Sequence, residues 1–175
     1  TLVEGWNFHQ VRAALRAADK LKQSLDADLS DAEVMASLGF EGEHPEGRFF
    51  PDTYQYTLGM SDQDILRRAH ERMASVLAEV WETRADNLPI KSPYEALILA
   101  SIVEKETGVP SERGQIAGVF TRRLQIGMRL QTDPTVIYGM GADYQGNIRR
   151  RHLQQATPYN TYVIDGLPPT PIAMP

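Results

Sequence analysis

The stretch "SPYEALILASIVEKETG", residues 92–108, decides how this chain folds. Ser92 followed by Pro93 is typical of a helix start, because serine caps free backbone N–H groups and proline suits the first helical position. The apolar run over residues 96–103 predicts that this helix packs in a core. The helix then reaches "EKET" before Gly108, so two carboxylates directly follow a core-type sequence.

Glu106 is the more informative of these two carboxylates. Ile102 and Leu99 lie one and two turns before it, so helical periodicity predicts that Glu106 continues an apolar face. Burial and the negative end of the helix dipole both raise the pKa of a carboxyl group. General acid catalysis needs an acid that is still protonated near neutral pH, and Thr107 places a hydroxyl beside this one. On this segment alone, a solvated helix terminus is the commoner outcome.

Capping residues and helical periodicity predict further helices on both sides of this stretch. The caps are Asn7, Ser30 and Ser61, and two of the helices end at Gly39 and Gly127. The predicted fold class is therefore α+β, mainly helical. We expect helices over residues 7–22, 31–38, 61–84 and 111–126, and short strands near residues 129–131 and 161–164.

The overall composition narrows the classes of protein. The chain has 175 residues, a formal net charge of −5 and 42% hydrophobic residues, which fits one globular domain or a domain with a small lobe. The acidic balance is against a nucleic-acid partner. The absence of cysteine excludes disulfides, thiolate metal sites and a cysteine nucleophile, and the four scattered histidines indicate no metal site. We expect no cofactor.

Two later segments carry polar and aromatic side chains suited to binding a sugar: "RLQTDPTVIYG" and "TPYNTY". Each residue taken singly has a common structural role, such as an Asp-Pro turn or a core tyrosine. Together with Glu106-Thr107 they give three motifs in order along the chain. An acid with a neighbouring hydroxyl comes first, then Leu-Gln, then Tyr-Asn. The residues noted in these segments are Arg129, Gln131, Asp133, Thr135, Tyr159, Asn160 and Tyr162.

This order resembles the lytic transglycosylases of the lysozyme-like superfamily, which carry a Glu-Ser pair, a Gly-Leu-Met-Gln segment and an Ala-Tyr-Asn segment. Threonine replaces serine and proline replaces alanine here. A closer resemblance is to the YceG-like family of endolytic murein transglycosylases, and it covers residues 46–175, with a looser match before them. It rests on three long strings: "EGRFFPDTYQY", "ASIVEKETGVPSERGQIAGVFTRRLQIGMRLQTDPTVIYGMG" and "TPYNTYVIDGLPPTPIAMP".

The family resemblance implies a lysozyme-like catalytic domain over residues 46–175, preceded by a small helical lobe over residues 1–45. Enzymes of this kind cut the β-1,4 bond between N-acetylmuramic acid and N-acetylglucosamine within glycan strands, and leave 1,6-anhydro-muramic ends. The catalytic acid falls on Glu106, which acts first as acid and then as base. The residues implied in substrate binding are Thr107, Arg129, Gln131, Asp133, Tyr159, Asn160 and Glu46.

The resemblance also implies where such a protein works. The chain starts at Thr1 rather than at methionine, so we expect a fragment of a longer protein. No apolar run approaches the roughly 20 residues of a membrane span. The family implies an anchor in the bacterial inner membrane through a missing N-terminal segment, with this part in the periplasm. The expected partners are peptidoglycan glycan strands and peptidoglycan synthases.

Other functions stay open at this point. A hydrolytic muramidase would use Glu106 as its acid and Asp133 as its second carboxylate. A non-catalytic peptidoglycan-binding module would keep an aromatic cleft and tolerate the loss of Glu106. A helical nucleic-acid binder is the third, and it would use basic patches such as residues 149–151.

Overall fold

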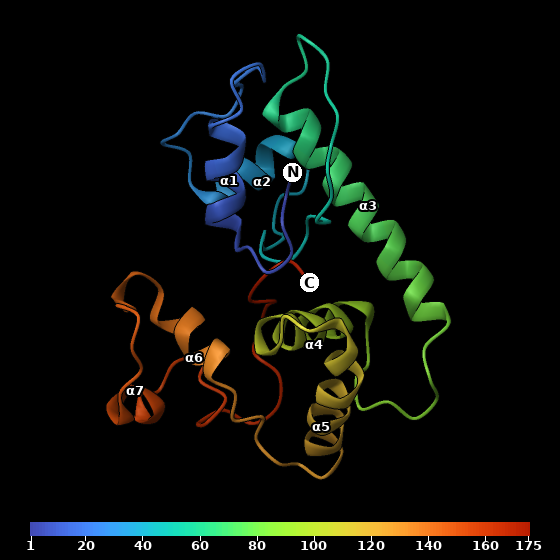
Figure 1. Ribbon diagram of the computed structural model, residues 1–175, viewed down its shortest axis with the longest axis vertical. Helices are drawn as coiled ribbons and strands as arrows, with labels where there is room; N and C mark the ends of the chain where they lie inside the picture. Colours follow the sequence, from blue (N-terminus) through green and yellow to red (C-terminus); the bar gives the residue numbers. More distant parts are fainter. The chain divides into compact units, whose positions relative to one another are not determined.

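The chain divides into two compact units in the computed structural model, which describes all 175 residues (Figure 1). The first unit comprises Thr1–Glu82 with Ala173–Pro175, and the second comprises Thr83–Ile172. The boundary that we predicted after residue 45 therefore falls within the first unit. The reason is that Phe49, beyond that boundary, stacks on Phe8 in the same core, with ring centroids 5.3 Å apart.

The first unit is built from the helices α1 (Phe8–Arg16), α2 (Asp31–Leu38) and α3 (Asp62–Glu82) around one core. The bounds of α2 are those predicted, because the Ser30 hydroxyl accepts from the N–H of Glu33 and Gly39 ends the helix with a φ of +90°. The predicted helix over residues 7–22 is shorter in the structure. After it ends, Lys22 pairs with Ser61 in an isolated parallel bridge.

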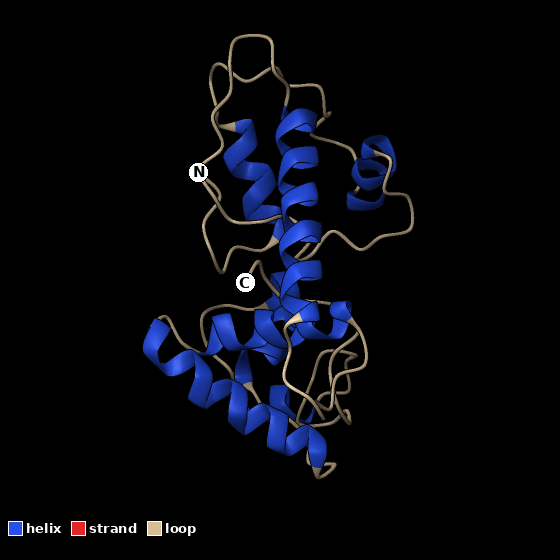
Figure 2. Cartoon of the chain, turned by 90° about the vertical axis from the view of Figure 1, so that its right-hand side faces the viewer, coloured by secondary structure: helices blue, strands red, loops and turns tan.

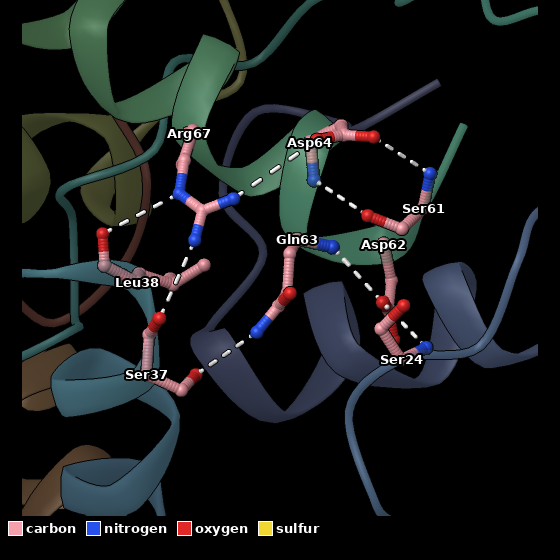
Figure 3. Close-up of polar contacts among 8 residues, drawn as sticks. All are labelled: Ser24, Ser37, Leu38, Ser61, Asp62, Gln63, Asp64 and Arg67. Carbon is pink, nitrogen blue, oxygen red and sulfur yellow. Dashed lines mark hydrogen bonds and ion pairs between the residues drawn. The ribbon is translucent and has the colours of Figure 1, made fainter.

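Asp62 anchors the start of α3. Its side chain is only 3% exposed, and its carboxylate accepts hydrogen bonds from three backbone N–H groups. The donors are Ser24, Leu25 and Gln63, at 3.0, 3.1 and 2.9 Å, and Figure 3 draws the first and last of these contacts. One buried carboxylate therefore joins the loop after α1 to the first turn of α3.

A capping box stands beside Asp62. The Ser61 hydroxyl accepts from the N–H of Asp64 at 3.2 Å, and the Asp64 carboxylate accepts from the N–H of Ser61 at 2.9 Å. These hydrogen bonds lower the pKa of Asp64 below its usual value. One turn further on, Arg67 reaches the carbonyl oxygens of Ser37 and Leu38 at the end of α2, so the start of α3 also holds α2 (Figure 3).

The second unit has one core around α4 (Pro93–Glu106). Ser92 caps this helix by accepting from the N–H of Glu95 at 3.2 Å, as the sequence predicts. The other elements are η1 (Pro110–Glu112), α5 (Arg113–Gln125), α6 (Asp133–Met140), η2 (Gly141–Asp143) and α7 (Arg150–Gln154). The buried members of the core are Ile98, Leu99, Ile102, Val103, Phe120, Leu130 and Ile172.

The mainly helical class is confirmed, but the predicted strands are wrong, and Figure 2 shows helices and loops alone. The two predicted strands do meet, through one backbone hydrogen bond from Gln131 to Thr161 at 3.2 Å. Gln131 has a φ of +53°, which breaks the extended backbone that a ladder needs. Directly after it, α6 begins at Asp133, where we predicted only a turn. None of the helices is both long and apolar enough to cross a bilayer.

Candidate active site

Glu106 is the last residue of α4, and its side chain is exposed. The prediction of a buried carboxyl is therefore wrong. Thr107 leaves the helix in an extended conformation with a φ of −143°, so no further helical turn covers Glu106. Glu106 Oε2 accepts a hydrogen bond from the Thr132 hydroxyl at 2.8 Å, and Oε1 has no hydrogen-bond partner. One oxygen of the carboxylate is thus fixed and the other is available.

Thr132 is itself held by two other buried threonines. Its N–H donates to the Thr161 hydroxyl at 3.0 Å, and its carbonyl accepts from the Thr135 hydroxyl at 2.8 Å. The hydroxyls of Thr135 and Thr161 share a further hydrogen bond of 2.8 Å. All three side chains are at most 3% exposed. This buried network fixes the hydroxyl that contacts Glu106.

A surface hollow of about 270 Å³ opens beside Glu106. Arg123 of α5 supplies its positive charge, and this guanidinium also donates to the carbonyl of Leu130. The hollow therefore combines an acid, a cation and an apolar wall. Its lining residues are Glu106, Ile116, Val119, Phe120, Arg123, Gln131 and Thr132.

A second carboxylate is tied to this region through a tyrosine. The Tyr162 hydroxyl donates to Asp133 Oδ1 at 2.6 Å. Partial burial, this hydrogen bond and the negative charges of Asp133 and Glu106 raise the pKa of Tyr162 to about 12. The phenol therefore stays protonated through neutral pH and remains a hydrogen-bond donor to Asp133.

Two more of the predicted substrate contacts have exposed side chains. Gln131 lines the hollow, as described above. Arg129 donates to the carboxylate of Asp165 and to the carbonyl of Tyr162, both at 3.2 Å, and its side chain is 47% exposed. The structure therefore brings Gln131 to Glu106, while a contact between Arg129 and substrate stays a prediction.

Thr107 and Asn160 have polar atoms engaged inside the protein. The Thr107 hydroxyl donates to Glu112 at 2.7 Å and accepts from the N–H of Val109 at 3.0 Å. Asn160 is 1% exposed, and its amide donates to three carbonyl groups around the end of α7. Its oxygen accepts from the N–H of Tyr162 at 3.0 Å. Both residues hold turns around the site.

Tyr159 and Glu46 also have partners within the chain. The Tyr159 hydroxyl shares a hydrogen bond of 2.7 Å with Thr170, and its ring packs edge-on against Tyr138. Glu46 belongs to the first unit, is 4% exposed, and accepts from the N–H of Phe8 at 2.9 Å at the start of α1. Little of the Glu46 side chain is left for a substrate, and its predicted role stays a prediction.

Thr132 and Arg123 were not predicted as site residues, and Tyr162 was noted beside Tyr159 and Asn160 without a role of its own. Thr132 lies between the predicted Gln131 and Asp133, so its place in the sequence was the available signal. The contact between Thr132 and Glu106 spans 26 residues and depends on the turn at Gln131, which no local pattern announces.

The sequence of this chain matches one family of known proteins. The YceG-like family matches residues 1–175. An endolytic murein transglycosylase of Bacillus subtilis is 31% identical over 99% of this chain and 52% of its own length. One of Streptococcus pneumoniae serotype 2 is 32% identical over 74% of this chain and 24% of its own length.

A solved structure agrees with these sequence matches. The crystal structure of a yceG-like protein from Listeria monocytogenes superimposes with a TM-score of 0.77 at 29% identity, over 99% of this chain and 61% of that one. The chain thus spans about half the length of the Bacillus relative and less than two thirds of the Listeria protein. Because the family match extends from the first residue to the last, the chain belongs to the YceG-like family.

Proposed function

We propose that this chain carries the catalytic region of an endolytic murein transglycosylase. It cuts the β-1,4 bond between N-acetylmuramic acid and N-acetylglucosamine inside glycan strands and leaves 1,6-anhydro-muramic ends. Membership of the YceG-like family and the names of the relatives support this function. The observation that carries it is Glu106, whose carboxylate borders a hollow with one oxygen held by Thr132.

A single carboxyl group suffices for this reaction. Glu106 protonates the glycosidic oxygen as the bond to the anomeric carbon breaks. The 6-hydroxyl of the same muramic ring attacks the anomeric carbon, and the Glu106 carboxylate takes its proton. No water is consumed, and the acid is regenerated.

Product analysis tests this function. Peptidoglycan digested by the chain is analysed by mass spectrometry for the chemistry of the new chain ends. Anhydro-muramic ends within long strands are the expected result. Release of short fragments from strand ends alone would contradict the endolytic part of the proposal. The absence of cleavage, repeated with a longer form of the protein, would favour a non-catalytic peptidoglycan-binding module.

A hydrolytic muramidase is the second candidate, and one observation favours it. Asp133 directly follows Thr132, whose hydroxyl donates to Glu106, so a second carboxylate is near the acid. Glycosidases that use water need such a second carboxylate. In this case the new ends would be reducing sugars, and Asp133→Asn would stop the reaction. The anhydro product and continued cleavage by Asp133→Asn would reject this candidate.

Thr132 gives a further prediction about the acid. Thr132→Val keeps the side-chain shape but removes the hydroxyl that donates to Glu106 Oε2. We expect kcat to fall by about tenfold, which corresponds to one hydrogen bond to a charged group, with KM little changed. Thr132→Ser keeps the hydroxyl and is expected to restore most of kcat. The kinetics of glycan cleavage measure both effects, and a full rate for Thr132→Val would exclude a positioning role.

We also propose a fold type for the catalytic unit and a cellular location for the full-length protein. The catalytic unit is lysozyme-like in its use of a helix-end glutamate at a cleft. The full-length protein is anchored in the bacterial inner membrane, this part lies in the periplasm, and it acts beside peptidoglycan synthases on newly made strands. Membership of the YceG-like family supports this location, as does the name of the Bacillus relative, which is a murein transglycosylase. Fractionation of cells that carry the full-length protein tests it.

A further inference from the structure

A second cavity lies at the opposite end of α6 from Asp133. It has a volume of about 580 Å³, which is within the usual size range of small-ligand sites. Met140 at the end of α6 lines it, together with η2 and α7. Its polar lining residues are Asp143, Gln145, Arg151, His152, Gln155 and Thr157. Neither the proposed chemistry nor the predicted substrate contacts use this cavity.

The charged groups of this cavity have no partner in the protein. Arg151 and Asp143 form no ion pair and no side-chain hydrogen bond, and both side chains are exposed and accessible to a ligand. His152 Nδ1 accepts from the N–H of Arg149 at 2.8 Å, so the neutral ring carries its proton on Nε2. The cavity therefore offers a cation, a carboxylate and a further N–H donor to a ligand.

The cavity wall is closely packed on the side of α6. A Cβ at Gly139 would lie 2.8 Å from Thr157 Oγ1 and 3.1 Å from the Cβ of Tyr159, so only glycine allows α6 to approach this segment so closely. Asn160 fixes the other side by binding the carbonyl groups of the α7 end. Close packing on one side and hydrogen bonds on the other thus fix the backbone that carries the polar side chains.

The distance between Asp133 and this cavity fits the peptide stem, which branches from the muramic acid of a peptidoglycan strand. The eight residues of α6 separate Asp133 from Met140 by about 10 Å, at 1.5 Å per residue. A peptide stem leaves the muramic ring and gains about 3.3 Å per extended residue, so three or four of its residues cover this distance. Stems carry carboxylates and an amino group, which complement a guanidinium and a carboxylate. The N-acetylglucosamine units of a glycan carry no carboxylate and no ammonium group, so they cannot form these ion pairs.

We propose that this cavity binds the peptide stem of the strand being cut, with Arg151 on a stem carboxylate and Asp143 on the stem ammonium group. This inference rests on the proposed transglycosylase function, because it takes the peptidoglycan strand as the substrate. It adds a specificity: the chain prefers strands that still carry their stems.

The test compares two substrates and two variants. One substrate is intact peptidoglycan, and the other is the same material after an amidase has removed the stems. Arg151→Ala is the test variant, and Arg150→Ala is its matched control, because Arg150 is the adjacent residue of α7 and does not line the cavity. We expect Arg151→Ala to lower kcat/KM roughly fivefold on intact peptidoglycan alone, the size of one charge-assisted contact at an open site. Arg150→Ala should change neither rate.

The other outcomes each decide the matter. Equal losses of Arg151→Ala on both substrates would mean that the cavity holds glycan, and no loss on either would mean that it holds nothing; both overturn the proposal. If the wild type cuts neither substrate, the transglycosylase function fails, and binding is then measured alone. The full chain is titrated with the stem tetrapeptide L-Ala–γ-D-Glu–L-Lys–D-Ala and followed by NMR. Amide shifts around Arg151 that Arg151→Ala abolishes support the stem site, and unchanged spectra overturn it.

Discussion

Glu106→Gln is expected to abolish glycan cleavage, with a loss of about a thousandfold or more in kcat. The amide carries no proton that it can give to the glycosidic oxygen, and it cannot then take one from the 6-hydroxyl. Its oxygen still accepts the hydrogen bond from Thr132, so the fold around the site is kept. Mass spectrometry of the digest measures the activity, and a thermal unfolding curve that matches the wild type shows that folding is intact.

The chain supplies a matched control in the same helix. Glu104 stands two residues earlier, pairs with Arg113 at 3.2 Å and does not line the hollow. Glu104→Gln removes the same charge from the same helix end, so we expect it to cleave at nearly the wild-type rate. Cleavage by Glu106→Gln at the wild-type rate would remove Glu106 from the chemistry. Equal inactivity of both variants would point to the charge of the helix end rather than to one acid.

Asp62→Ala is expected to give the largest loss of stability. The substitution leaves three part-buried backbone N–H groups, of Ser24, Leu25 and Gln63, without their protein acceptor. Water can reach some of these donors, so each costs less than a fully buried one, and the free energy of unfolding of the first unit should fall by about 2 kcal/mol. Asp64→Ala breaks the part-buried capping box of the same helix and a 4.0 Å ion pair with the half-exposed Arg67, and should cost distinctly less.

Tryptophan fluorescence makes this measurement specific to the first unit. The chain has two tryptophans, Trp6 and Trp81, and both belong to that unit. Urea unfolding followed by fluorescence therefore reports on the unit that holds Asp62. The prediction is wrong if Asp62→Ala loses no more stability than Asp64→Ala does.

Helix positions are the part of the fold that the sequence predicts well. Ser30 with Gly39, and Ser92 with Pro93, mark helix ends correctly, because capping is a local interaction over three or four residues. The family resemblance, together with its place in the last turn of α4, indicated Glu106 as the candidate acid. Local patterns thus located α1 to α5, but not α6 and α7.

Long-range contacts are the part that the sequence could not provide. Glu106 looked buried because helical periodicity describes a continuing helix, whereas α4 ends at that residue. Asn160 was selected for a substrate and instead holds the carbonyl groups at the end of α7, which no pattern had predicted as a helix. The role of Thr132 depends on residues up to 29 positions away.

The left-handed backbone at Gln131 has a consequence for how this site changes during evolution. A φ of +53° is costly for valine, isoleucine or threonine and cheap for glycine or asparagine. A change to a β-branched residue would push the backbone back towards an extended conformation and move Thr132 away from Glu106. The position is therefore constrained twice, by a main-chain conformation that glycine and asparagine can also adopt and by a side chain that lines the hollow.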